Sequence, residues 1–218
     1  MTWTLGGLPL HSLRLTHPAS GAWVADVSVA SEVPVGLTGP VPLVLPGLTL
    51  QGTVVSGGVS FRRQRVRVVG GAGKLGAEIP GQHFRLADVR TIASWLCSTA
   101  GEMLDAANSD VGLLAWQLDH WQHHAGTAAQ GLDLLAQQFD TQWRVSPQGQ
   151  VILGDLLWRS DDAVELEADL LEEDLTNRVL TCVTTDVTIQ PGTTFRGRRV
   201  LSVDHRADGS RWRSLVRW

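Results

Sequence analysis

The sequence is poor in features that define several common classes of protein. Among 218 residues there are two cysteines, Cys97 and Cys182, and both lie in apolar surroundings. They form neither a disulfide framework nor a C-x-x-C metal clasp, so we expect two buried free thiols. With 43% apolar residues, the chain can build ordinary cores without disulfides.

Long apolar runs are also absent. No stretch of about 18 apolar residues, the length needed to span a bilayer, occurs in the chain. The first residues lack the basic region and apolar run of a secretory leader. We therefore expect no membrane insertion, and we expect the protein to stay in the cytoplasm that made it until it joins a larger assembly.

Lysine is nearly absent from the sequence, and tyrosine is absent altogether. Lys74 is the single lysine beside 17 arginines, and nine tryptophans occur without a tyrosine. Arginine makes planar, bidentate contacts better than lysine, so the bias suits protein interfaces. The tryptophans follow no period, which favours packing and interface anchors over a sugar-binding ladder. Trp218 is the candidate for insertion into a partner.

The net charge of −4 hides an asymmetry along the chain. Eight of the fourteen residues 161–174 are acidic, whereas residues 196–217 contain seven arginines and two acids. Such patches can be solvated faces, complementary subunit surfaces or a nucleic-acid site. The candidate partner-interface residues are Arg63, Arg65, Arg67, Glu172, Glu173, Asp174, Arg196, Arg198, Arg199 and Trp218.

Residues 8–70 have the pattern of short strands. Apolar and polar residues alternate, and glycine and proline punctuate the stretch, which predicts a small barrel or sandwich. Segments 50–59 and 61–69 predict a hairpin that turns at Gly57–Gly58 or nearer Arg62. In its second strand Arg63, Arg65 and Arg67 share one face, and Gln64, Val66 and Val68 share the other.

The middle of the chain changes to helical periods. Spacings of three and four predict a helix from Arg85 to Ala107, whole or broken at Gly101, with Leu86 and Met103 in its inner stripe. A second helix is predicted from Thr127, or Gly126, to Phe139. A hairpin follows, with a type I turn at Ser146-Pro147-Gln148-Gly149.

Residues 176–218 return to strands, predicted at 178–187, 194–205 and 212–218, with the last turn at Asp208–Gly209. Segment 46–55 matches segment 191–200 at five of ten positions. Shared turn chemistry can produce such a match; the other interpretation is a duplicated module. We predict an α+β, mostly β fold with two related small β-barrel domains, 1–75 and 176–218, and an inserted helix-helix-hairpin α+β domain, 76–175.

Candidate chemical sites are few. His120 and His124 would lie one helical turn apart and could share a metal, but the glutamate of a zinc protease is missing. Glu102 and Asp105 have no acidic partner at a glycosidase spacing. The Gly70–Gly76 segment lacks the Ser or Thr of a phosphate-binding loop, and we interpret it as a flexible link. We therefore predict no catalytic residue, no cofactor site and no metal site, and hence no enzyme.

Several short segments occur in a characteristic order along almost the whole chain. They are residues 23–27, 50–55, 100–102, 126–136, 143–151 and the strand after Pro191-Gly192. In this order the chain resembles the hub proteins of bacteriophage baseplates and tail tips, a family that includes the hub portion of type VI secretion spike proteins. The larger members of that family carry an appended spike, an oligonucleotide-binding-fold extension or a lysozyme domain. We expect the spike to be a separate protein here, and a central hub and an adjacent adaptor ring are both compatible with the resemblance.

The resemblance implies a structural homotrimer. Three subunits with two barrels each would form a pseudo-six-fold ring that joins a six-fold tail tube to a three-fold spike and lines the channel for DNA in transit. The implied partners are a tail tube protein or tube-terminating ring, a spike or needle protein, other baseplate proteins and a tape-measure protein. The implied location is the virion, at the tail tip or baseplate, with the host cytoplasm during assembly.

Two expectations follow for such a ring. Its lumen must avoid strong attraction to phosphate, because DNA would otherwise stall. The acidic segment 161–174 should lie near the lumen or at a subunit contact, since heterologous contacts set one surface against a different surface of the next copy. A tail-associated cell-wall hydrolase and a receptor- or carbohydrate-binding module are the alternatives.

Overall fold

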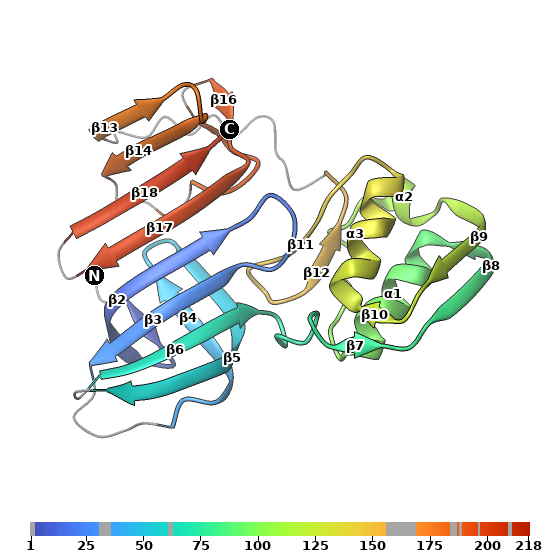
Figure 1. The fold of residues 1–218 in the computed structure, drawn as a ribbon, viewed down its shortest axis with the longest axis horizontal. Helices are drawn as coiled ribbons and strands as arrows, with labels where there is room; N and C mark the ends of the chain where they lie inside the picture. Colours follow the sequence, from blue (N-terminus) through green and yellow to red (C-terminus); the bar gives the residue numbers. More distant parts are fainter. Residues whose placement is uncertain are drawn as a thin grey trace.

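The computed structural model describes residues 3–30, 36–60, 63–155, 169–183, 187, 189–195, 197–208 and 211–218. Most of its strands join one large antiparallel sheet, and a smaller part with the helices is attached to one side (Figure 1). The predicted fold class, α+β and mostly β, is confirmed. Within the described residues no helix has the length and apolar character needed to cross a membrane.

Six N-terminal strands close into a barrel. They are β1 (Thr4–Leu5), β2 (Leu8–His17), β3 (Val24–Ala30), β4 (Gly39–Leu45), β5 (Leu48–Ser60) and β6 (Arg63–Gly70). Their order is β1-β4-β5-β6-β3-β2, and β1 closes the circle by pairing with both β4 and β2. Strict alternation in β6 shows why the sheet has two faces, because every second side chain is buried inside the barrel.

The β5–β6 hairpin has the predicted strands. Gly57 and Gly58 lie within β5, so the hairpin does not turn there, and Ser60 pairs with Arg63. The alternative position at Arg62 lies outside the described residues. The two sets lie on opposite faces, as predicted. Gln64, Val66 and Val68 are buried, whereas Arg63, Arg65 and Arg67 are exposed.

A tryptophan explains why two glycines face each other at the start of this hairpin. Gly52 of β5 pairs with Gly70 of β6. The indole of Trp23 lies against both, because a Cβ at Gly52 would be 2.5 Å from Trp23 Cη2 and one at Gly70 would be 2.6 Å from Trp23 Nε1. Only glycine leaves room for this buried ring.

The C-terminal strands extend the same sheet. They are β13 (Asp169–Asp174), β14 (Val179–Val183), β17 (Ser202–Asp208) and β18 (Arg211–Arg217), in the order β17-β18-β14-β13. β17 pairs with β2, which makes the sheet ten-stranded. A separate hairpin consists of β15 (Thr194–Phe195) and β16 (Arg198–Arg199).

The two β-rich parts share one strand order. In the first, the β2–β3 hairpin is followed in space by β6 and then β5. In the second, the β13–β14 hairpin is followed by β18 and then β17. The last strand of each module, β6 or β18, pairs on one side with the second strand, β3 or β14. On its other side it pairs with the third strand, β5 or β17. The chain therefore contains the same four-stranded, antiparallel module twice, and the first copy is completed to a barrel by β1 and β4.

The ten-residue match in the sequence does not coincide with this structural equivalence. Gly52 lies inside β5 under Trp23, whereas Gly197 has a φ of +73° in the open turn between β15 and β16. The expected equivalence of Gly52 and Gly197 is wrong. Both segments begin with a Pro-Gly turn in which the glycine has positive φ, at Gly47 and Gly192, so turn chemistry accounts for the match.

The middle of the chain forms the attached part. It contains β7 (Glu78–Ile79), β8 (Gln82–Asp88), α1 (Val89–Ala100), α2 (Val111–Leu114), β9 (Gln117–His123), β10 (Gly126–Thr127), α3 (Ala128–Gln138), β11 (Trp143–Val145) and β12 (Val151–Leu153). β8 pairs with β9, β7 with β10, and β11 with β12. The ribbon shows α1 and α3 side by side (Figure 1), and Gly131 brings α3 close to Leu96 of α1.

The predicted first helix is too long at both ends. It begins at Val89, after Asp88 caps the amide of Thr91, and it ends before Gly101, whose φ of 81° suits only the end of a helix. Leu86 lies instead in β8 and is exposed, as is Met103. Residues 117–123, which the helical interpretation of His120 and His124 required to be helix, form strand β9.

The second helix and its hairpin are confirmed. Thr127 and Gln130 form a capping box at the start of α3. The turn between β11 and β12 is closed by the Gly149 amide, which donates to the Ser146 carbonyl at 2.9 Å.

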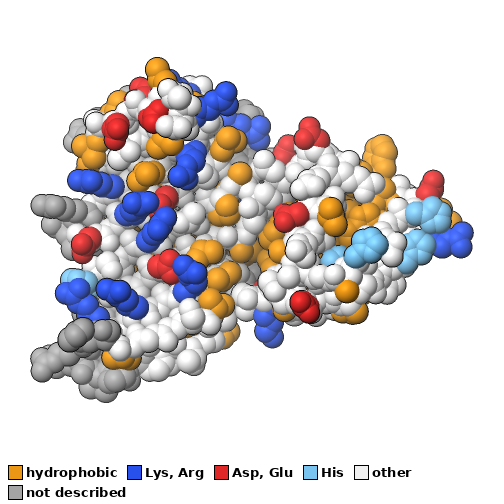
Figure 2. All heavy atoms as spheres, in the orientation of Figure 1, with side chains coloured by type: hydrophobic (Ala, Val, Ile, Leu, Met, Phe, Trp, Pro, Cys, Tyr) orange, Lys and Arg blue, Asp and Glu red, His pale blue; other side chains and the backbone are white. Residues whose placement is uncertain are grey.

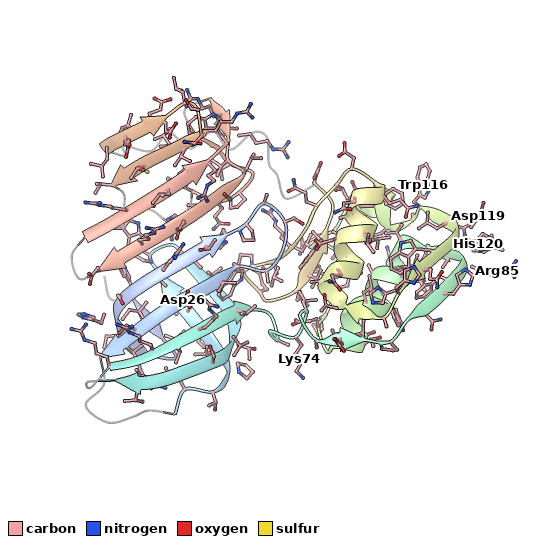
Figure 3. The ribbon with its side chains drawn as sticks, viewed as in Figure 1. Asp26, Lys74, Arg85, Trp116, Asp119 and His120 are labelled. Carbon is pink, nitrogen blue, oxygen red and sulfur yellow. The ribbon has the colours of Figure 1, made fainter. Side chains whose placement is uncertain are left out.

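The attached part is fixed to the barrel by backbone bonds and by a shared core. The Gln51 amide donates to Pro147 O at 2.7 Å, and the Gly21 amide donates to Trp143 O at 2.8 Å. One continuous cluster of buried apolar side chains runs from the barrel through α1 and α3. The Gly70–Gly76 link is not free, because the buried Glu102 carboxylate accepts from the amides of Ala72 and Lys74, both at 2.8 Å. Lys74 marks this link in Figure 3.

We predict that Gly52→Ala lowers the free energy of unfolding by about 1–3 kcal/mol, because the new Cβ overpacks the Trp23 indole. The matched control is Gly58→Ala on the same strand, where an added Cβ meets nothing within 4 Å, and a change below about 1 kcal/mol is expected. Urea denaturation followed by tryptophan fluorescence measures both. Equal effects of the two substitutions would contradict the packing explanation.

Candidate functional site

The outward side of the large sheet carries a row of arginines across five strands. Cross-strand neighbours run from Arg213 on β18 to Arg206 on β17, Arg14 on β2, Asp26 on β3 and Arg67 on β6. Figure 2 shows this side of the molecule, with blue side chains gathered over these strands, and Figure 3 marks Asp26 in the middle of the sheet. We call the outward surface formed by Arg14, Arg63, Arg65, Arg67, Arg206 and Arg213 the arginine face.

A buried carboxylate holds two of these arginines where the modules join. Asp204 of β17 is 3% exposed, and its Oδ2 accepts from Arg14 Nη2 at 3.1 Å and from Arg206 Nη2 at 2.7 Å. The two guanidinium groups are about half exposed. Asp204 therefore screens two cross-strand arginines that would otherwise repel each other.

A second pair lies next along the row. Arg67 donates to both oxygens of Asp26, from Nε at 2.8 Å and from Nη2 at 2.9 Å. The hydrogen bond from Arg67 is the main cause that lowers the pKa of Asp26. Both side chains are about half exposed, so the pair fixes orientation more than it adds stability.

The other three arginines of the arginine face have no carboxylate partner among the described residues. Arg63, Arg65 and Arg213 are exposed and form no ion pair with the described residues. A hollow of about 820 Å³ opens on this face between β17, β2, β3, β6 and the distal half of β5. The predicted set Arg63, Arg65 and Arg67 is thus brought together, and its neighbours Arg14, Arg206 and Arg213 were missed.

The C-terminal candidates form a second group. Arg198 pairs with Glu173 of β13, and its guanidinium carbon lies 4.2 Å from the centre of the Trp218 ring. Trp218 also packs on the small core of this module. Arg198 therefore contacts two other predicted interface residues within the chain.

The other C-terminal candidates have separate places. Asp174 accepts from the Asn177 amide at 2.9 Å, and hydrogen bonds from Asn177 lower its pKa. Glu172 and Arg199 are exposed on β13 and β16. Arg196 and the acidic residues 161–168 lie outside the described residues.

Two edges of the large sheet lack a partner strand within the described chain. β13 pairs only with β14, and it exposes Leu170 and Leu171. β5 pairs with β4 only up to Val54 and continues to Ser60 with β6 alone. This distal half exposes Val55 and Val59. Open edges with exposed apolar side chains are typical sites for pairing with another chain.

The histidines at 120, 123 and 124 are placed differently from the helical expectation, because His120 and His123 lie on strand β9. His120 stacks on His83 across β8 and β9, with ring centres 5.6 Å apart, and Figure 3 places His120 at the outer tip with Arg85 and Asp119. His123 points inward beside Trp95 and Trp121. The described residues contain no group of three or more metal-ligating side chains. Cys97 and Cys182 are buried, as expected, and are not joined by a disulfide.

A smaller cavity of about 370 Å³ lies where the two modules and the attached part meet. Buried His17 lines it, and no described group bonds its Nε2. Burial, with His205 and Arg144 nearby, lowers the pKa of His17 from 6.5 to about 3. Burial also lowers the pKa of Arg144 to about 10, and Arg144 Nη1 donates to Pro191 O at 3.1 Å.

Comparison with solved structures identifies the class of fold. Over 99% of this chain, the fold is similar to the 43 kDa tail protein of prophage MuSo2 from Shewanella oneidensis, with 96% of that chain covered, 11% identity and a TM-score of 0.65. It is also similar to the tail protein from Neisseria meningitidis MC58, again over 99% of this chain, with 95% of that chain covered, 13% identity and a TM-score of 0.63.

A third similar structure comes from a secretion system. The E. coli c3393 protein is a component of the type VI secretion system and is structurally similar to the T4 bacteriophage tail proteins gp27 and gp5. The match covers 99% of this chain and 76% of that one, at 10% identity and a TM-score of 0.66. No family model matches the sequence, and no curated protein matches it. The chain thus has a phage tail protein fold, which confirms the resemblance seen in the sequence at the level of the fold.

We predict that Asp204→Asn lowers the free energy of unfolding by about 1–2 kcal/mol, because charge-assisted hydrogen bonds are lost and Arg14 faces Arg206 without a counter-charge. Asp208→Asn is the matched control, since Asp208 is exposed on the same face of the same strand. Urea denaturation at low salt measures both. A loss as large for Asp208→Asn would contradict the screening role.

We predict a pH dependence from His17. Between pH 6.5 and about 3 the unfolded chain binds a proton at this imidazole and the folded chain does not, so stability falls as pH falls, by about 1.4 kcal/mol per unit from this group. His17→Leu should remove that part of the slope in urea titrations, and NMR titration of the folded protein should find the imidazole neutral at pH 5. Protonation near pH 6.5 would contradict the prediction.

Proposed function

We propose that the chain is a structural, non-enzymatic hub protein of a bacteriophage tail tip or baseplate. For its domains we keep the predicted division 1–75, 76–175 and 176–218, except that β13 (Asp169–Asp174), which pairs with β14, belongs to the second module. Three copies form a pseudo-six-fold ring that joins a six-fold tube to a three-fold spike and surrounds the path of DNA. The observation that carries the proposal is the repeated strand order, β2-β3-β6-β5 and β13-β14-β18-β17.

The strand pairing that joins the two modules within one chain, which we call a joint, indicates how modules of neighbouring chains would pair. Within the chain, β17, the third strand of the second module, pairs antiparallel with β2, the first strand of the first module. The equivalent joint in a ring pairs β5 of one copy with β13 of the next. Those are the two edges of the large sheet that lack a partner strand in the described residues.

The two edges match in length and character. Residues 55–60 of β5 and 169–174 of β13 are each six residues long. Both expose aliphatic side chains, Val55 and Val59 on one and Leu170 and Leu171 on the other. Pairing would bury these groups together and satisfy the free backbone of both edges. It would also bring the acidic end of the sheet to its arginine-bearing end, which suits complementary subunit surfaces.

Three intrachain and three interchain joints of this kind close a ring of six modules. This heterologous contact uses a different surface on each side, as a closed cyclic assembly requires. A ring of six modules made from three chains supports the match between six-fold and three-fold neighbours. The partners are therefore a tube protein or tube-terminating ring on one side and a spike or needle protein on the other, with tape-measure and further baseplate proteins. The protein is made in the host cytoplasm and ends in the virion.

Cross-linking tests the ring even where rings are a minor species. We expect the double variant Val59→Cys/Leu171→Cys, treated with a short flexible bis-maleimide, to give covalent dimers and trimers on denaturing gels, because the reagent captures β5–β13 contacts. The native cysteines are buried. The control Val59→Cys/Leu134→Cys places the second thiol on an exposed position of α3. Equal cross-linking in both variants, or none in either, would refute the joint.

A further inference from the structure

We propose that the arginine face is a sequence-independent contact surface for the phosphate backbone of DNA. The binding itself is a property of one chain. Only the direction of the face, which we place toward the ring axis, rests on the proposed ring.

The charge of the face differs in sign from the charge of the protein. Six arginines and three aspartates, Asp26, Asp204 and Asp208, lie on this surface. The whole chain has a net charge of −4. A cationic patch on an acidic protein concentrates polyanions locally, and a concave shape strengthens the effect.

The side chains between the arginines favour phosphate over a protein partner. The hollow is lined by Ser12, Ser56, Gly57 and Gly58 beside the arginines. Serine hydroxyls and arginines are the usual donors to phosphate oxygens. Aromatic and aliphatic anchors of the kind found at protein interfaces are few on this face. Most large exposed apolar side chains of the described chain lie on β13 and the turn after it, on the β5 edge and on the attached part, with Val183 at the end of β14 and Leu201 just before β17.

Spacing also suits a repeating anion. Arg63, Arg65 and Arg67 project from one side of β6 at intervals of two residues, which is about 6.8 Å along an antiparallel strand. Neighbouring strands add arginines about 4.8 Å to the side. A guanidinium group binds phosphate through two parallel hydrogen bonds. The face therefore offers donors along a backbone without reading bases.

The aspartates set an upper limit on affinity. Asp204 and Asp26 hold Arg14, Arg206 and Arg67, which leaves Arg63, Arg65 and Arg213 to bind phosphate without breaking an ion pair. Three phosphate contacts give a slope of about −2.7 for log K against log salt, or about 40-fold weaker binding at 200 mM than at 50 mM. A polymer held this weakly can slide, which reconciles a cationic wall with the expectation that DNA must not stall.

Fluorescence anisotropy with labelled duplexes tests the face on the full-length protein. We expect two duplexes of unrelated sequence to bind equally at low salt, with the slope given above. Arg65→Ser/Arg213→Ser should reduce the magnitude of the slope by about 1.8. The control Arg85→Ser removes an exposed arginine at the far tip (Figure 3) and should change nothing.

The outcomes separate this inference from the ring. No binding at 20 mM salt, an equal loss in Arg85→Ser, or displacement of the duplex only by polyglutamate and not by unlabelled DNA would overturn the phosphate surface. Cross-linked trimers together with any of these results would leave the ring intact. DNA binding without cross-linking would leave the face intact and remove its place in a channel.

Discussion

The antiparallel ladder between β2 and β17 is the contact on which the rest of the molecule depends. It joins residues 190 positions apart, such as Arg14 and Asp204. Among the described residues, the second module has a separate core of seven buried apolar side chains, which is small for a module of four strands. Its stability therefore comes from continuing the barrel's sheet and from Trp212, which packs against Trp3 at 4.3 Å and joins the main core.

The same ladder fixes which side chains share the outward surface. A slip of one residue between β2 and β17 would turn Arg206 inward and expose Ala207. The Asp204 carboxylate, bonded to Arg14 of one module and Arg206 of the other, penalises that slip because it would bury an unpaired charge. A polar joint thus specifies register, while the apolar cores on either side supply most of the free energy.

The sequence correctly predicted those elements whose structure depends on residues close together in the chain. The alternation of β6, the capped helix from Thr127 and the Pro147 turn follow from a few neighbouring residues, and each is confirmed. The β8–β9 pairing was missed because the two strands are separated by α1 and α2, and because β8, in which Leu86 has a φ of 49°, shows no alternation of buried and exposed residues. The arginine row could be predicted only in part, since Arg63, Arg65 and Arg67 share a strand but Arg14 and Arg206 reach them through long-range register.

The two kinds of joint in the proposed ring have different side chains, and the difference agrees with the different entropy costs of forming them. The β2–β17 joint forms within one chain, where the strands are tethered, so polar pairs suffice to select its register. A β5–β13 joint must also offset the loss of translational and rotational freedom of a separate copy. The aliphatic side chains exposed on those two edges, Val55, Val59, Leu170 and Leu171, supply apolar area for that purpose. In a ring of three chains and six modules, the β2–β17 and β5–β13 joints therefore have the same strand pairing, but the first needs polar pairs and the second needs apolar side chains.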